Sequence, residues 1–358
     1  ILLTIYNMHN SINIKSYLLS SFFIIILTLH ITPVESNSIR QSSTIDIENI
    51  ENLMIEQVNI GPRHPGSPGS LVFKNWLFNQ TDSSWDIEIQ KFTHLDTEVN
   101  NYFITHSTSI SWPKYIFGAH YDSRKVADKD ELYPHLPVPG ANDGASGVAV
   151  ILEMLSHIPS DYKNQTGFIL FDAEDQGSGG MEGWDWIIGS EYFVSQMSDE
   201  EISSTEFFLL FDMIANDELT LRYEANSDDL LNEEIWNIAH SLGYQNIFEK
   251  RIGVSIIDDH RPFLDVNIPS VNLIDLLGYP EHHTIHDTME NVSPENAAIV
   301  LDVVIEWMKS TYWVGGTPTS SMFYNSNTSE TTIFIPIVIL TLLSSKILYR
   351  KYLLNNLN

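Results

Sequence analysis

Histidine and carboxylate residues recur at five separated points of this 358-residue chain, mostly after a short apolar run. The segments that contain them are Gly118–Asp122, Pro139–Asp143, Phe171–Asp175, Leu210–Met213 and Glu281–Thr284. Imidazole combined with carboxylate suits zinc better than calcium or magnesium, which prefer shells of oxygen alone. The chain has no cysteine, so zinc here would be held by nitrogen and oxygen, which is typical of hydrolytic rather than structural sites.

Apolar strands that alternate with helices must position these residues. We predict strands at 115–118, 167–171, 206–211 and 269–274, and helices at 146–155, from 190 onward, at 230–242 and at 295–313. Two helices, at 45–58 and about 71–79, and two strands, at 85–92 and 101–105, precede them, and Ser70 is predicted to cap the second helix. This pattern predicts an α/β fold with a mostly parallel central sheet that helices cover on both faces.

The ends of the predicted strands explain how distant residues would meet. Ligands bind at the carboxyl ends of the strands in sheets of this kind. The residues in question are His120, Glu174, Asp175 and Asp212, just past strand ends, and Asp143, ahead of a helix. Each alone would be read as an ordinary loop or capping residue. Their shared position favours a single site at one edge of the sheet.

Residues 38–315 form a segment long enough for one sizeable hydrophobic core. The whole chain has a formal net charge of −29. So acidic a protein repels polyanions, which argues against nucleic acid and anionic lipid as partners.

The N-terminal residues 1–36 have the pattern of a secretory signal peptide. Lys15 precedes an apolar run at 17–29, and small and polar residues follow it. An uncleaved N-terminal anchor is the alternative. Residues 1–7 precede Met8, and we interpret them as a mis-assigned start.

The C-terminal residues have the pattern of a membrane anchor. A polar tether at 316–331 leads to an apolar run at 332–349, close to the roughly 20 residues that span a bilayer. The basic tail at 350–358 favours a cytoplasmic C-terminus. We therefore expect a membrane-anchored protein at the cell surface with its folded domain outside. An amphipathic helix packed on the domain is the alternative.

The order of the motifs resembles that of the M28 zinc exopeptidases and of their relatives, the glutaminyl-peptide cyclotransferases. The resemblance covers about residues 45–315. The motifs that carry it are His120–Ser123, Asn142–Gly147, Ala173–Gly177, Asp212–Ile214 and His283–Thr288. It implies an α/β/α sandwich and an enzyme that acts on peptides with free N-termini.

The resemblance also implies a set of metal ligands. His120 and Asp212 would hold one zinc ion, and Asp175 and His283 would hold a second. Asp143 would bridge the two ions.

Two further residues have implied roles in hydrolysis of the N-terminal peptide bond. Asp122 would orient His120 through the far ring nitrogen. Glu174 would be the general base for a metal-activated water and would pass its proton to the leaving amine.

Cyclisation of an N-terminal glutamine by a single zinc ion is the alternative interpretation of these motifs. The segments at 138–141, 171–172 and 258–263 and a long insertion after Asp175 resemble the cyclotransferases. That resemblance implies one zinc held by Asp143, Asp175 and His283. The cyclotransferases have Trp where this chain has His282, and we therefore favour hydrolysis. A non-catalytic ectodomain is the least favoured reading, because an intact Glu174 accompanies the ligand set.

Four other residues are predicted to line the substrate pocket. They are Trp184, Trp186, Asp259 and His282. The oligomeric state, the natural substrate and its side-chain preference stay open at this stage.

Overall fold

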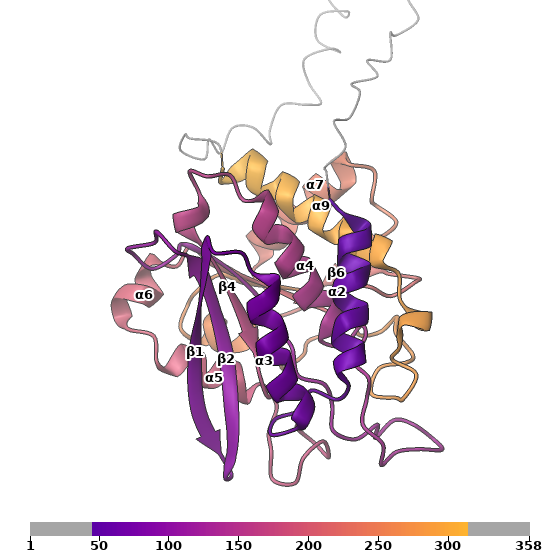
Figure 1. Cartoon of the computed structure of the whole chain (residues 1–358). Helices are drawn as coiled ribbons and strands as arrows, with labels where there is room; N and C mark the ends of the chain where they lie inside the picture. The colour runs from indigo at the N-terminus through magenta and orange to yellow at the C-terminus, as the bar shows by residue number, and fades with distance from the viewer. Residues whose placement is uncertain (1–44, 314–358) are drawn as a thin grey trace, which may run out of the picture. The chain divides into compact units, whose positions relative to one another are not determined.

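The computed structural model describes residues 45–313, which form one folded unit (Figure 1). The predicted signal segment at 1–36, tether at 316–331, membrane helix at 332–349 and tail at 350–358 lie outside these residues. None of the helices within 45–313 is long and apolar enough to cross a membrane.

The central sheet has six strands in the order β1-β2-β4-β3-β5-β8. The strands are β1 (Trp85–His94), β2 (Thr97–His106), β3 (Tyr115–His120), β4 (Thr166–Phe171), β5 (Phe207–Asp212) and β8 (Ser270–Ile274). The pairs β4–β3, β3–β5 and β5–β8 are parallel, whereas β1–β2 and β2–β4 are antiparallel. The predicted mostly parallel sheet is therefore confirmed, with an antiparallel hairpin at one edge.

Helices cover both faces of this sheet, as predicted. On one face α2, α4 and α9 contact one another over the larger apolar core, with α7 against α9 and α3 beside α2 (Figure 1). On the other face α5 contacts α8 over a smaller core that contains Phe171, Phe208 and Phe263. The helices are α2 (Ile47–Ile60), α3 (Pro68–Gln80), α4 (Ala145–Met154), α5 (Ile188–Ser195), α6 (Asp199–Ser204), α7 (Asp229–Ser241), α8 (Arg261–Asp265) and α9 (Pro294–Thr311).

Local sequence signals account for most of these elements. Every residue of β3, β4, β5 and β8 is buried, which explains their continuous apolar sequences. The predicted cap of α3 was wrong. The helix begins at Pro68, and Ser67 rather than Ser70 caps it by accepting a hydrogen bond from the backbone N–H of Ser70. Proline suits the first helical position because its φ is already helical and no N–H is lost there.

Short elements escaped prediction. The strands β6 (Leu221–Tyr223) and β7 (Phe248–Ile252) form a separate parallel pair. Three 3-10 turns lie at Leu155–His157, Lys163–Gln165 and Met289–Asn291. β6 has three residues, and β7 carries a Glu-Lys-Arg run, so neither shows the apolar alternation that identifies a half-buried strand.

Candidate active site

The carboxyl edge of the sheet brings the five predicted ligands together. His120 and Asp212 are the last residues of β3 and β5. Asp175 lies in the turn after β4, and Asp143 lies just before α4. His283 lies on the loop that follows β8. All five side chains are buried.

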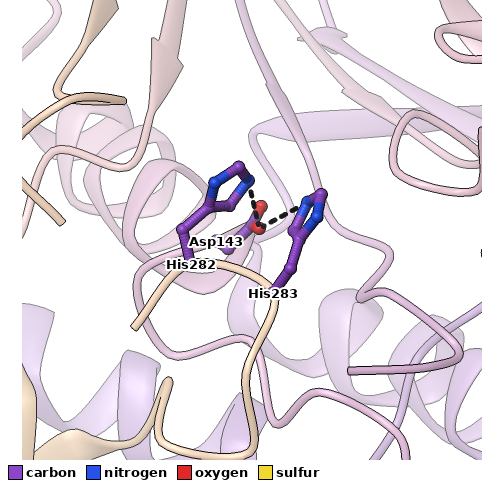
Figure 2. A group of neighbouring side chains, drawn as sticks. All are labelled: Asp143, His282 and His283. Carbon is purple, nitrogen blue, oxygen red and sulfur yellow. Dashed lines mark ion pairs between the residues drawn. The ribbon is translucent and has the colours of Figure 1, made fainter. Parts of the chain in front are cut away.

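Asp143 occupies the centre of this group. Its Oδ1 lies 3.1 Å from Nε2 of His120, which in turn lies 3.2 Å from Oδ1 of Asp212. Its Oδ2 lies 3.7 Å from Nε2 of His283 and 3.6 Å from Nε2 of His282 (Figure 2). Nε2 of His283 also lies 2.9 Å from Oδ1 of Asp175. The two oxygens of one carboxylate therefore face two different sets of donors.

These distances fit a metal ion on either side of Asp143. Donor atoms about 2.0–2.1 Å from a tetrahedral zinc lie roughly 3.3 Å apart. Two triads of potential ligands have all their donor atoms within 4.8 Å of one another. They are His120 with Asp143 and Asp212, and Asp143 with His282 and His283. Within residues 45–313, Oδ2 of Asp143 and Oδ2 of Asp175 are buried without a hydrogen-bond partner. Buried carboxylate oxygens normally have partners, so these two are suited to a cation.

The charges around His120 also favour a cation. Burial alone would lower the pKa of His120, but Asp122, Asp143 and Asp212 together raise that pKa well above its usual value. So negative a pocket attracts cations.

Glu174 is the chain neighbour of Asp175, and the two residues line the same cavity. Its pKa is raised well above the usual value by burial and by the nearby charge of Asp258. Burial and Asp212 raise the pKa of Asp258 to about 7, and Oδ2 of Asp258 accepts a hydrogen bond of 2.6 Å from Asn272. These acids hold protons readily, as proton transfer near neutral pH requires.

Asp122 faces Nδ1 of His120, and its carboxylate also supports the turn after β4. Nδ1 of His120 lies 3.1 Å from the backbone carbonyl of Asp122 and 3.5 Å from its Oδ1. The carboxylate accepts hydrogen bonds from the backbone N–H groups of Glu174 and Asp175 at 3.1 and 3.3 Å, and from the side chain of Gln176 at 2.9 Å. Asp122 therefore holds the turn that carries the candidate base as well as facing His120.

Two further residues that sequence reasoning missed position the ligands. Asp287 accepts backbone hydrogen bonds from Asn142 and Asp143, and a hydrogen bond of 2.6 Å from the hydroxyl of Tyr279. Arg124 donates to the backbone and to the carboxylate of Asp175. Asp287 falls in the His283–Thr288 motif, which marked the segment but not this role. Arg124 is a single arginine in a loop, and no sequence motif marks its role.

A cavity of about 620 Å³ opens above these residues. Arg124, Asp143, Glu174, Asp175, Asp212, Asp258, His282 and His283 form its polar wall. Met213, Ile256, Ile257, Ile274, Leu276 and Leu277 form an apolar wall. The volume is that of a typical small-ligand pocket, so it accommodates the end of a peptide.

Two of the four predicted pocket residues line this cavity. Trp186 does so with its ring 6.0 Å from that of His283 and nearly parallel to it. His282 lies beside His283, and burial lowers the pKa of His282 to about 3, so its ring is neutral.

The other two predicted pocket residues lie elsewhere. Trp184 packs into an apolar cluster with Val99, Ala173 and Ile188, because that contact buries the large ring away from the cavity. Asp259 is fully buried behind the cavity wall, and burial together with Asp258 raises the pKa of its carboxyl well above the usual value.

Comparisons with known proteins agree with this geometry. The aminopeptidase YwaD of Bacillus subtilis is 29% identical over 234 residues, which are 61% of this chain and 45% of that protein. The chain thus spans less than half the length of this relative. A leucine aminopeptidase precursor from Bacteroides thetaiotaomicron has a TM-score of 0.65 and 26% identity, and covers 74% of this chain and 97% of its own.

A glutaminyl cyclase fits equally well. The enzyme from Porphyromonas gingivalis has a TM-score of 0.65 and 25% identity, over 74% of this chain and 98% of its own. Residues 104–308 match peptidase family M28. The matched segment is more than half of the chain, and the chain therefore belongs to peptidase family M28.

Proposed function

We propose that this protein is a zinc-dependent exopeptidase that hydrolyses the N-terminal bond of peptides. The position of Asp143 is the observation that supports this most. Its two carboxylate oxygens face separate donor sets, with His120 and Asp212 on one side and Asp175 and His283 on the other. A shared carboxylate between two donor sets is what a two-metal hydrolase requires.

The five ligands would hold two zinc ions, with Asp143 between them. When bound, zinc polarises the scissile carbonyl and lowers the pKa of the attacking water. The aminopeptidase among the curated relatives and the leucine aminopeptidase precursor among the solved structures support this assignment.

The chain's own residues would handle the proton and the substrate. Glu174 takes the proton from the attacking water and returns it to the leaving amine. The carboxylate of Asp122 keeps Glu174 in place by accepting a hydrogen bond from the backbone N–H of Glu174. The apolar wall of Met213, Ile256 and Leu276 excludes water and receives the first side chain of the peptide.

Cyclisation of N-terminal glutamine is the second candidate, and one observation favours it. Burial raises the pKa values of Glu174, Asp258 and Asp212, and the charge of Asp258 raises that of Glu174 further, as the charge of Asp212 does for Asp258. In cyclisation the α-amine loses a proton as it attacks the side-chain carboxamide, and ammonia gains one as it leaves. Such carboxyls are suited to that transfer. Similarity to a glutaminyl cyclase over 98% of its chain supports this candidate.

Metal content measured beside two assays separates the candidates. The full-length protein is incubated with a leucyl peptide and with a glutaminyl peptide, and released amino acid and released ammonia are quantified. We expect two zinc ions per chain and release of the N-terminal residue from the leucyl peptide. One zinc ion together with ammonia release and no hydrolysis would establish the cyclase instead.

A further inference from the structure

Two adjacent histidines face the same carboxylate oxygen. The rings of His282 and His283 have centroids 3.7 Å apart, and both point toward Asp143 (Figure 2). Consecutive side chains of an extended chain point in opposite directions. His283 has a φ of 62°, in the left-handed region that non-glycine residues rarely adopt. This strained conformation brings both rings to one side of the loop.

Two roles are open to His282 in this position. Its Nε2 lies within reach of Asp143 and His283, so the three residues together have the arrangement of a metal-binding group. A histidine that binds a metal through Nε2 must carry its proton on Nδ1. A histidine that donates a hydrogen bond from Nε2 must leave Nδ1 without a proton.

Lys129 distinguishes the two roles. Its Nζ lies 2.7 Å from Nδ1 of His282. A lysine ammonium has only donors, so Nδ1 of His282 must be the acceptor. The proton of a neutral ring then lies on Nε2, which faces the cavity beside Asp143. The backbone N–H of Lys129 also donates to the carbonyl of His283 at 3.2 Å, so Lys129 contacts both histidines.

We propose that His282, held by Lys129 with its proton on Nε2, is a catalytic hydrogen-bond donor to the carbonyl oxygen under attack. As the nucleophile bonds to the carbonyl carbon, the π electrons move to oxygen, and the Nε2–H of His282 stabilises this charge without giving up its proton. The electrons return when the amine or ammonia leaves. Donors aimed at a developing oxyanion contribute strongly to catalysis.

This inference rests on the proposed function only in that a carbonyl group is attacked at this site. Hydrolysis of a peptide bond and cyclisation of a glutamine side chain both include that step. The role of His282 therefore does not depend on which of the two reactions the protein performs.

The test uses His282→Leu and His282→Gln in the full-length protein, with zinc content and kinetics measured on whichever peptide the wild type converts. Leucine removes the donor, whereas glutamine keeps an N–H. We expect His282→Leu to lower kcat by about 10²–10³-fold, the typical effect of losing one such donor, with little change in KM and none in zinc content. His282→Gln is expected to recover part of kcat. His286→Leu serves as the matched control, because that side chain is 68% exposed and does not line the cavity.

A second measurement does not depend on activity. Imidazole ¹⁵N shifts of zinc-loaded protein labelled at histidine, assigned by the loss of signals in His282→Gln, are expected to show His282 protonated on Nε2. Lys129→Met is expected to release this preference. A proton on Nδ1, loss of zinc in His282→Leu, an unchanged kcat, or no advantage of Gln over Leu would each overturn the proposal. A wild type that converts neither peptide refutes the proposed function, and the proton position then still tests the pairing of Lys129 with His282.

Discussion

The two sides of Asp143 are built in different ways. On the strand side, His120 and Asp212 end two neighbouring parallel strands, β3 and β5, whose hydrogen-bonded register determines where each side chain emerges. On the loop side, Asp175 and His283 lie on irregular segments. Each segment contains a left-handed non-glycine residue, Ala173 with a φ of 61° and His283 with a φ of 62°, and on the strand side Met213, with a φ of 45°, follows Asp212 only after its strand has ended.

The difference shows which parts of the fold position the ligand side chains on each side of Asp143. The strand side inherits its geometry from the sheet, and Asp122 lies beside the ring of His120 there. The loop side depends on side chains that bind loop backbones, such as Arg124 at Asp175. It also carries His282, which Lys129 contacts. Replacing these supporting side chains is therefore expected to disturb the loop side more than the strand side.

Replacing the shared residue is expected to have the largest effect. Asp143→Ala removes the one carboxylate that faces both donor sets, so both zinc ions should be lost. Metal analysis of the purified variant measures this directly, with circular dichroism to establish that it is folded. Retention of a full complement of zinc would contradict the central position of Asp143.

Separate replacements on the two sides sharpen the comparison. His120→Ala and His283→Ala should each reduce the zinc content from two ions to one, because each removes a ligand from one set only. The same assay tests the alternative. A protein with one zinc on the loop side would lose it in His283→Ala and keep it in His120→Ala.

Glu174→Gln should leave zinc binding intact on both sides and still nearly abolish turnover. Glutamine keeps the shape of the side chain but cannot accept the proton, and general bases contribute about 10²–10⁴-fold to rates. Metal content and kcat of the same preparation measure both effects. If zinc were lost with the activity, Glu174 would be a ligand and its role would have been exchanged with that of Asp175.

The same contrast explains what could be predicted from the sequence. Continuous apolar runs identify buried strands. The sequence alone therefore placed β3 and β5, together with the residues at their ends. Loop conformation depends on distant partners. No local sequence pattern predicts that Arg124 binds the turn at Asp175. Nor does any local pattern predict that Trp184 packs inward while Trp186 faces the cavity.

A smaller loss of activity is expected when a methyl group is added next to Trp186 on the loop side. A Cβ on Gly177 would lie 2.6 Å from the ring of Trp186, so Gly177→Ala must displace that ring from its place beside His283. We expect kcat/KM to fall on the order of tenfold with zinc content unchanged, because small displacements near reacting groups are costly. Gly253→Ala is the control, since its new methyl group meets the side chain of Arg222 and the backbone carbonyl of Tyr223, and neither residue lines the cavity. Equal kinetics in both variants would show that the position of Trp186 is unimportant.

The last prediction concerns stability rather than turnover, at a place behind the site where buried Glu224 pairs with His260 at 3.0 Å. Burial alone would raise the pKa of Glu224, but the hydrogen bond and charge of His260 lower it from 4.5 to about 2. Because the folded-state pKa is the lower one, this carboxylate stabilises the fold above about pH 4.5. That stabilisation is lost as the pH falls from there toward 2.

Urea unfolding of the wild type and of Glu224→Gln at pH 6, 4 and 3 tests this sign. The wild type should lose on the order of 2 kcal/mol more than the variant over this range, because only the wild type has this carboxylate to protonate. Equal slopes of stability against pH would mean that Glu224 is not ionised in the folded protein. The segment 256–260 would then be held by neutral hydrogen bonds rather than by an ion pair, although the backbone N–H of Ile256 still donates to Glu224.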